Sequence, residues 1–209
     1  MKVPTLEQAS KFIKYAEESN PGEWISHSYN VARAAKAIAS ECPDLDGDIA
    51  YVLGLLHYIG RYEAHVHMHH SVSGYDFLIK RGYNDAARIA LTHSFILADI
   101  SVYAGKVDCT EAELTFVKEF LKNTTYDDYD KLIQLCDAIA LADGLCLMEK
   151  RLLDVVMRYG IKDTTLLKWK TQLGLRDYFS EKIGKSIYEV LDGVVEMTFG
   201  FNPIIPCKI

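Results

Sequence analysis

The amino-acid sequence predicts an all-helical fold. Apolar residues recur at the i, i+3, i+4 and i+7 spacing of an amphipathic helix along most of the 209 residues. Thr5 with Gln8 and Thr110 with Glu113 have capping-box spacing, which marks the start of a helix. No stretch alternates apolar and polar residues between hairpin signals, as a half-buried strand would. These observations together favour a bundle of helices.

The first half of the chain predicts five helices. The third is apolar on every face from Ile49 to Leu56, so we expect it to be buried at the centre. Gly60 is expected to end this helix in a left-handed conformation, and Gly82 to end the next one. Asn84 or Asp85 can cap the fifth helix. The expected ranges are 5–19, 23–41, 45–58, 70–80 and 84–95.

The second half predicts five more helices and a loop at 101–108. The expected helix ranges are 110–122, 129–143, 146–159, 164–173 and 178–199. No linker, repeat or low-complexity segment interrupts them, which favours a single domain over 1–209. The last three helices are expected to form an extension, about 144–209, on a core at about 23–143.

The composition argues against several classes of protein, including nucleic-acid-binding, secreted and membrane-spanning proteins. A net charge of −6 disfavours polynucleotide binding, which usually requires a basic face. The N-terminus lacks a signal-peptide apolar core, and the longest apolar run is too short to span a bilayer. The cysteines are odd in number, far apart and without a CxxC pair, as expected of free thiols in a reducing cytoplasm. They are Cys42, Cys109, Cys136, Cys146 and Cys207.

Five ionisable residues fall on apolar faces of the expected helices: His27, His57, His70, His93 and Asp137. Imidazoles and a carboxylate from separate helices are a typical ligand set for zinc, iron or manganese. A lone histidine on an apolar face is more often hydrogen-bonded to a backbone carbonyl than bound to a metal, and Asp137 alone is equally explained by a cap or an ion pair. The remaining histidines, His65, His67 and His69, alternate in a segment that we interpret as a solvated loop.

The order of these residues resembles the HD-domain superfamily of metal-dependent phosphohydrolases. The matching segments are 27–32, 54–61, 70–75, 91–94 and 135–138, so the resemblance covers about 23–143. It implies an HD-type helical bundle in which His27, His57 and Asp137 bind a divalent metal, with His70 and His93 available to a second ion. It also implies cleavage of phosphate esters, with iron, manganese, zinc or magnesium as the cofactor.

The sequence departs from the family at its defining position. The residue after His57 is Tyr58 rather than aspartate, and a phenol has one oxygen and an ordinary pKa near 10. We therefore expect a weakened site that holds one ion, binds metal weakly or has lost it. The alternatives are an active phosphohydrolase, a degenerate ligand-binding or regulatory module, and a helical module whose histidines only pack.

In an active enzyme, Arg61 is a candidate phosphate contact, with a surface ion pair to Glu63 as the alternative. His70 or His93, if not a metal ligand, could serve as general acid. The expected partner is a small phosphorylated molecule such as a nucleotide, with no polynucleotide and no membrane. A homo-oligomer is compatible with the sequence.

Overall fold

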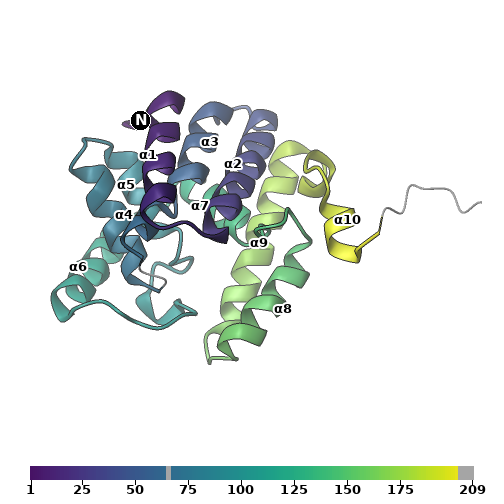
Figure 1. Ribbon diagram of the computed structural model, residues 1–209. Coiled ribbons are helices and arrows are strands. Elements are labelled where there is room, and N and C mark those ends of the chain that lie inside the picture. Colours follow the sequence, from purple (N-terminus) through teal and green to yellow (C-terminus); the bar gives the residue numbers. More distant parts are fainter. Residues whose placement is uncertain (65–66, 202–209) are drawn as a thin grey trace, which may run out of the picture.

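The computed structural model describes residues 1–64 and 67–201, so His65 and Cys207 lie outside the described residues. The all-helical prediction is confirmed, because the described residues form helices and no strand (Figure 1). The α-helices are α1 (Leu6–Ser19), α2 (Glu23–Glu41), α3 (Gly47–Leu56), α4 (His69–Ile79), α5 (Asn84–Thr92), α6 (Glu111–Lys122), α7 (Asp128–Asp137), α8 (Met148–Tyr159), α9 (Thr165–Ile183) and α10 (Val194–Phe199). The 3₁₀-helices are η1 (Ile59–Glu63), η2 (Ile100–Val102) and η3 (Ile187–Val190).

Side-chain caps explain where several helices begin. Both predicted capping boxes are present, at Thr5 before α1 and at Thr110 before α6. Asp46 accepts hydrogen bonds from the first amides of α3, and Asp127 does the same for α7. The predicted cap of α5 is wrong. Tyr83 precedes that helix without a side-chain cap, and Asp85 accepts a hydrogen bond from the Lys2 amide instead.

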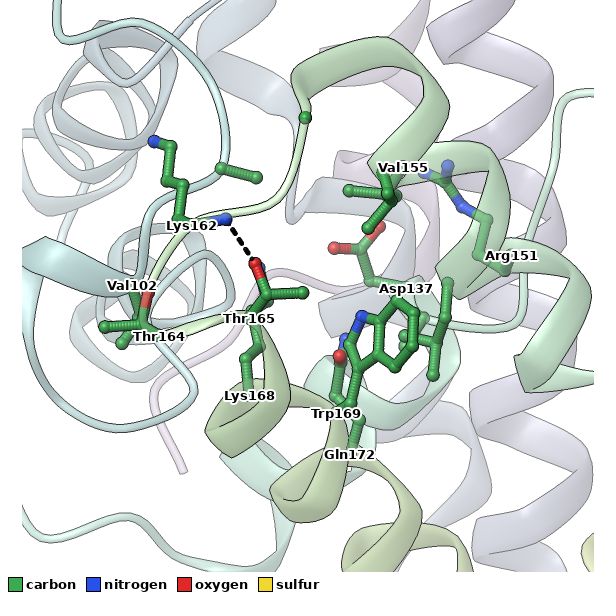
Figure 2. Close-up of a pocket in the computed structure, with 15 residues that line it drawn as sticks. Val102, Asp137, Arg151, Val155, Lys162, Thr164, Thr165, Lys168, Trp169 and Gln172 are labelled. Carbon is green, nitrogen blue, oxygen red and sulfur yellow. Dashed lines mark hydrogen bonds between the residues drawn. The ribbon is translucent and has the colours of Figure 1, made fainter.

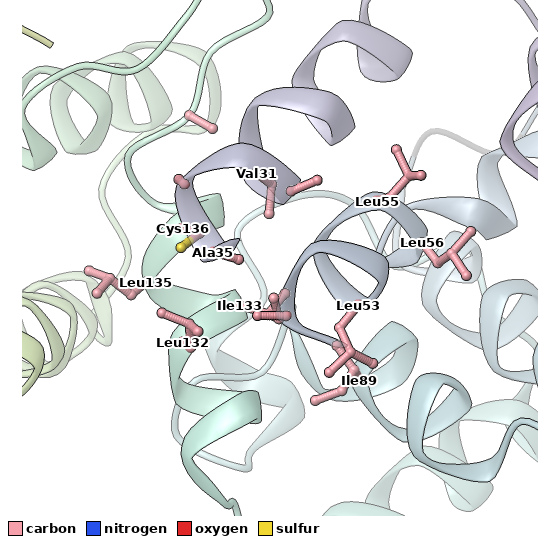
Figure 3. Close-up of a cluster of buried hydrophobic side chains, with 14 of the residues drawn as sticks. Val31, Ala35, Leu53, Leu55, Leu56, Ile89, Leu132, Ile133, Leu135 and Cys136 are labelled. Atoms are coloured by element: carbon pink, nitrogen blue, oxygen red, sulfur yellow. The ribbon is translucent and has the colours of Figure 1, made fainter. Parts of the chain in front are cut away.

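The helix α3 lies in the core, as its apolar sequence predicts. Its glycine, Gly54, lets α2 approach closely, because a Cβ there would lie 2.8 Å from the Ala32 Cα. Side chains of α2, α3 and α7 meet beside it, with Val31, Leu53 and Ile133 almost fully buried (Figure 3). Residues of every α-helix except α6 belong to this buried apolar cluster. The helix α6 covers a second, smaller cluster, formed by Met68, Val72, Leu91, Phe95, Val117 and Leu121.

The predicted end of α3 is wrong. The helix stops at Leu56, and the chain then turns into η1. Gly60 lies inside η1 and is not left-handed. Its role is close approach: a Cβ on Gly60 would overlap the carbonyl oxygen of His70 and the amide nitrogen of Gly74, so α4 packs directly on this backbone. Gly82, by contrast, adopts the predicted left-handed conformation after α4, with a φ of 81°.

The C-terminal part also differs from the prediction. The helix α7 ends at Asp137 rather than at residue 143, because the chain folds back and the Cys146 amide donates to the Ile139 carbonyl at 2.9 Å. The helix α9 continues to Ile183, since Gly174 is tolerated within it. The predicted helix 178–199 is broken by Gly184 and Gly193, both left-handed. None of the described helices has the length and apolarity needed to span a membrane.

Candidate metal centre

Helix ends bring the predicted site residues together. His57 and His93 follow the last residues of α3 and α5, Asp137 is the last residue of α7, and His70 is in the first turn of α4. His27 is on α2 and is buried. The ends of four helices therefore meet beside α2, at a point enclosed by the bundle.

The two histidines that follow helices are oriented by unpaired carbonyls of those helices. His57 donates from Nδ1 to the Gly54 carbonyl at 2.6 Å, and His93 donates from Nδ1 to the Ala90 carbonyl at 2.9 Å. His70 makes the same contact with the His67 carbonyl. A carbonyl oxygen can only accept, so each Nδ1 carries the proton and each Nε2 presents a lone pair. This is the tautomer that binds a metal through Nε2.

Three of the predicted ligands form one group. Ligand atoms of His27, His57 and Asp137 all lie within 4.8 Å of one another, and no other such group of three occurs in the described part of the chain. The His27 Nε2 is 3.0 Å from Asp137 Oδ1, and the His57 Nε2 is 3.9 Å from the same oxygen. Two imidazoles and a carboxylate are a donor set that suits a divalent transition metal.

The His57 Nε2 is the strongest indication that these residues fit a cation. The side chain is fully buried, and this nitrogen has no hydrogen-bond partner within residues 1–64 and 67–201. Its lone pair lies near the negatively charged Asp137 carboxylate, which repels it. A buried polar atom without a partner costs about 1–3 kcal/mol. A cation between the two groups would remove that cost.

His70 and His93 form a separate pair beside this group. Their Nε2 atoms are 3.2 Å apart. Because both Nδ1 atoms donate to carbonyls, two lone pairs face each other, an arrangement that a shared proton or a cation stabilises. The Ser94 hydroxyl lies 2.9 Å from the His93 Nε2 and can also donate to it. The structure thus divides the five predicted ligands into a group of three and an adjacent pair.

Tyr58 packs against both sets of histidines. Its ring centroid is 4.2 Å from that of His57 and 4.8 Å from that of His70. Burial, with the Asp137 charge, raises the pKa of Tyr58 to about 12, so the phenol is neutral at physiological pH. Tyr58 therefore supplies no negative charge where an aspartate would.

Burial also determines the charge of the other site residues. It lowers the pKa of His57 and His70 well below the usual value, and it lowers the pKa of His93 to about 4. Burial alone would raise the pKa of Asp137, but the close contact between its Oδ1 and the His27 Nε2 holds that pKa well below its ordinary range. Neutral imidazoles with an ionised carboxylate are the protonation states that metal binding requires.

A cavity of about 640 Å³ opens in front of these residues, and His27, His70, His93 and Asp137 form part of its wall. Arg61 also lines it, with its guanidinium 4.5 Å from the centroid of the Tyr58 ring. The Glu63 carboxylate, the predicted alternative partner of Arg61, accepts hydrogen bonds from the Tyr62 and Ser73 hydroxyls. The position of Arg61 is compatible with a contact to a bound phosphate.

Part of the cavity lining comes from residues that the sequence prediction missed. Arg151 of α8 and Lys168 of α9 line the cavity, and no local sequence motif marks either residue. The interpretation of the 65–69 segment as a solvated loop is wrong at His69, which begins α4 and lies 3.0 Å from a Glu113 oxygen. His69 therefore takes no part in the group of three.

Comparison with known proteins gives one match. Residues 24–142 match the family model described as HD domain. The matched segment contains all five predicted ligands and ends before α8. No curated protein and no solved structure matches the chain.

Proposed function

Because the match covers more than half of its length, the chain belongs to the HD domain family, and we propose that it is a metal-dependent phosphohydrolase. The proposed substrate is a small phosphorylated compound of about the size of a nucleotide. The cavity volume of about 640 Å³ supports this size, because small-molecule sites usually enclose about 300–1,000 Å³. A polynucleotide or a membrane is not part of the proposal.

One observation carries the proposal: the buried His57 Nε2 has no hydrogen-bond partner among the described residues and lies beside Asp137. With His27, these residues would hold one divalent ion, for which iron, manganese or zinc suits the donor set better than magnesium. When bound, such an ion lowers the pKa of water and neutralises charge on a phosphoryl oxygen.

The protein side chains would perform the remaining tasks. Arg61 would orient the phosphate from the edge of the cavity. Burial lowers the pKa of His93 to about 4, so its ring is neutral at physiological pH, and we assign its Nε2 to accepting a hydrogen bond from the attacking water. Ser94 would hold the position of the His93 Nε2 through their 2.9 Å contact.

Metal analysis of protein purified without chelator tests the proposal, together with phosphatase assays after manganese, iron or zinc has been added. We expect about one ion per chain and metal-dependent release of phosphate. His57→Gln should lose both. His69→Gln is the matched control, because His69 contacts Glu113 outside the group of three, and it should retain both. A parent protein without metal and without activity would refute the proposal.

Tyr58 supports a second candidate, a degenerate HD domain that binds a ligand or regulates a partner without catalysis. The neutral phenol leaves His27, His57 and Asp137 with a single carboxylate. Tyr58→Asp discriminates between the two candidates. If this variant gains metal and activity that the parent lacks, the natural protein is degenerate. If the parent turns over substrate as fast as the variant, the degenerate candidate fails.

A further inference from the structure

We propose that Lys168 and Arg151 form an anion-binding subsite for a phosphate group of the substrate. Both residues belong to helices that follow the family match at 24–142, so this subsite would be particular to the C-terminal extension. The inference rests on the proposed function, since it assigns the substrate of the same cavity a phosphate on its α8–α9 side. The residues that would form the subsite are Lys168, Arg151 and Gln172.

Lys168 is an ammonium group that faces the cavity without a counter-ion. It lines the main cavity and the adjoining recess, and no hydrogen bond or ion pair joins its side-chain ammonium to any residue in the described ranges. Burial lowers the pKa of Lys168, whereas the Asp137 charge raises it. A partly desolvated cation of this kind is costly unless an anion binds next to it.

Arg151 adds a second donor on the same wall. Its Nη1 donates to the Asp154 carboxylate at 2.5 Å, but its buried Nε has no partner among the residues described. Arg158 shares the same carboxylate, with its Nη2 2.7 Å from Asp154. Two guanidiniums and Lys168 against the Asp154 and Asp137 carboxylates leave these lining residues with an excess of about one positive charge, which favours an anion such as phosphate.

The recess has a size and a polarity that suit a phosphate group. Its volume is about 90 Å³, room for a group of several heavy atoms. Asp137, Arg151, Lys168 and Gln172 line both the recess and the main cavity, so an anion bound there would lie next to a predicted metal ligand (Figure 2). The buried Gln172 Oε1 has no donor in the described part of the chain and could accept from a protonated phosphate oxygen.

A competing explanation is that Lys168 is only the counter-ion of Asp137, whose charge raises its pKa. The two explanations predict different effects of replacing Lys168. A counter-ion stabilises Asp137 itself, so its removal should change metal content or stability. A phosphate ligand should affect anion affinity and leave metal content as it is.

The experiment measures inorganic phosphate binding by calorimetry, and metal content in parallel, on the full chain. We expect Lys168→Gln to weaken phosphate binding by at least about tenfold, as for the loss of one charge-assisted hydrogen bond, with metal content unchanged. Lys168→Arg should restore most of the affinity. Lys170→Gln is the matched control, because Lys170 is exposed on the same helix and lines neither cavity; it should bind phosphate as the parent does.

Phosphate affinity within twofold of the parent in Lys168→Gln would overturn the subsite, as would a parent that binds no phosphate. Loss of metal in Lys168→Gln would also overturn it in favour of the counter-ion explanation. If Lys168→Gln does not fold, Arg151→Gln decides, because a phosphate affinity within twofold of the parent in that variant contradicts the inference. The proposed function fails separately: a metal-free parent whose phosphate binding still depends on Lys168 refutes the metal centre and leaves the subsite standing.

Discussion

Acidification of the metal-free protein should destabilise it through His93. Burial lowers the pKa of this residue from 6.5 to about 4, so between these pH values the unfolded chain binds the proton and the folded chain does not. The free energy of unfolding therefore decreases as the pH falls through this interval. His57 and His70, whose pKa values burial also lowers, act in the same direction.

The size of this loss in the free energy of unfolding follows from the shift in the pKa of His93. A difference of about 2.5 pKa units corresponds to about 3 kcal/mol once the pH is below 4, and to about 2 kcal/mol between pH 7.5 and pH 5. The low pKa of Asp137 adds a further loss only where the unfolded carboxylate protonates, near pH 4 and below. The loss between pH 7.5 and pH 5 therefore reports on the histidines.

The assay is urea unfolding of chelator-treated protein at pH 7.5 and pH 5, for the parent and His93→Asn. Asparagine can retain a donor to the Ala90 carbonyl but does not titrate. We expect the free energy of unfolding of the parent to fall by at least about 2 kcal/mol, and that of the variant to fall by about 2 kcal/mol less. Equal pH dependence in the two proteins would refute the reasoning, as would a parent whose stability does not change.

Three further predictions concern packing, charge and capping. Gly60→Ala should destabilise the protein by at least about 1–3 kcal/mol in urea unfolding, because its Cβ would overlap backbone atoms of α4. Its matched control Gly174→Ala, in open space on α9, should be neutral or stabilising by up to about 1 kcal/mol; similar effects for both would contradict the packing argument. Arg88→Met should cost about 3–5 kcal/mol, because it leaves the fully buried Asp130 carboxylate without its cation, and a loss below 1 kcal/mol would show that the pair is dispensable. Asp46→Ala should lower the free energy of unfolding by about 1 kcal/mol through loss of the α3 cap, and an unchanged urea midpoint would count against that role.

Most of the fold could be predicted from local sequence. Helical periodicity identified the helices, and the Thr5 and Thr110 capping boxes located two helix starts, because a cap depends on residues within one turn. Helix ends were less predictable. The helix α7 stops at Asp137 because the chain beyond it pairs with residues 144–146, a contact that helical periodicity does not report.

The candidate site was predictable in its members but not in its grouping. Ionisable residues on apolar faces, taken in order along the chain, identified His27, His57, His70, His93 and Asp137 as the residues to examine. Nothing in the sequence indicated that three of them would gather while His70 and His93 faced each other. That division depends on where the tertiary structure places the helix ends that carry them.

The sequence by itself determined the helices and the polar residues on their apolar faces, because both depend on residue type at short, regular spacing, and the order of those residues along the chain indicated the family. Only the tertiary structure decided the orientation of the lone pairs, the neutrality of Tyr58 and the cationic wall of Arg151 and Lys168. The physical reason is that a carbonyl orients each ring, burial determines each charge, and a cavity brings together residues far apart in the chain. Such interactions act through space, and helical periodicity does not encode them.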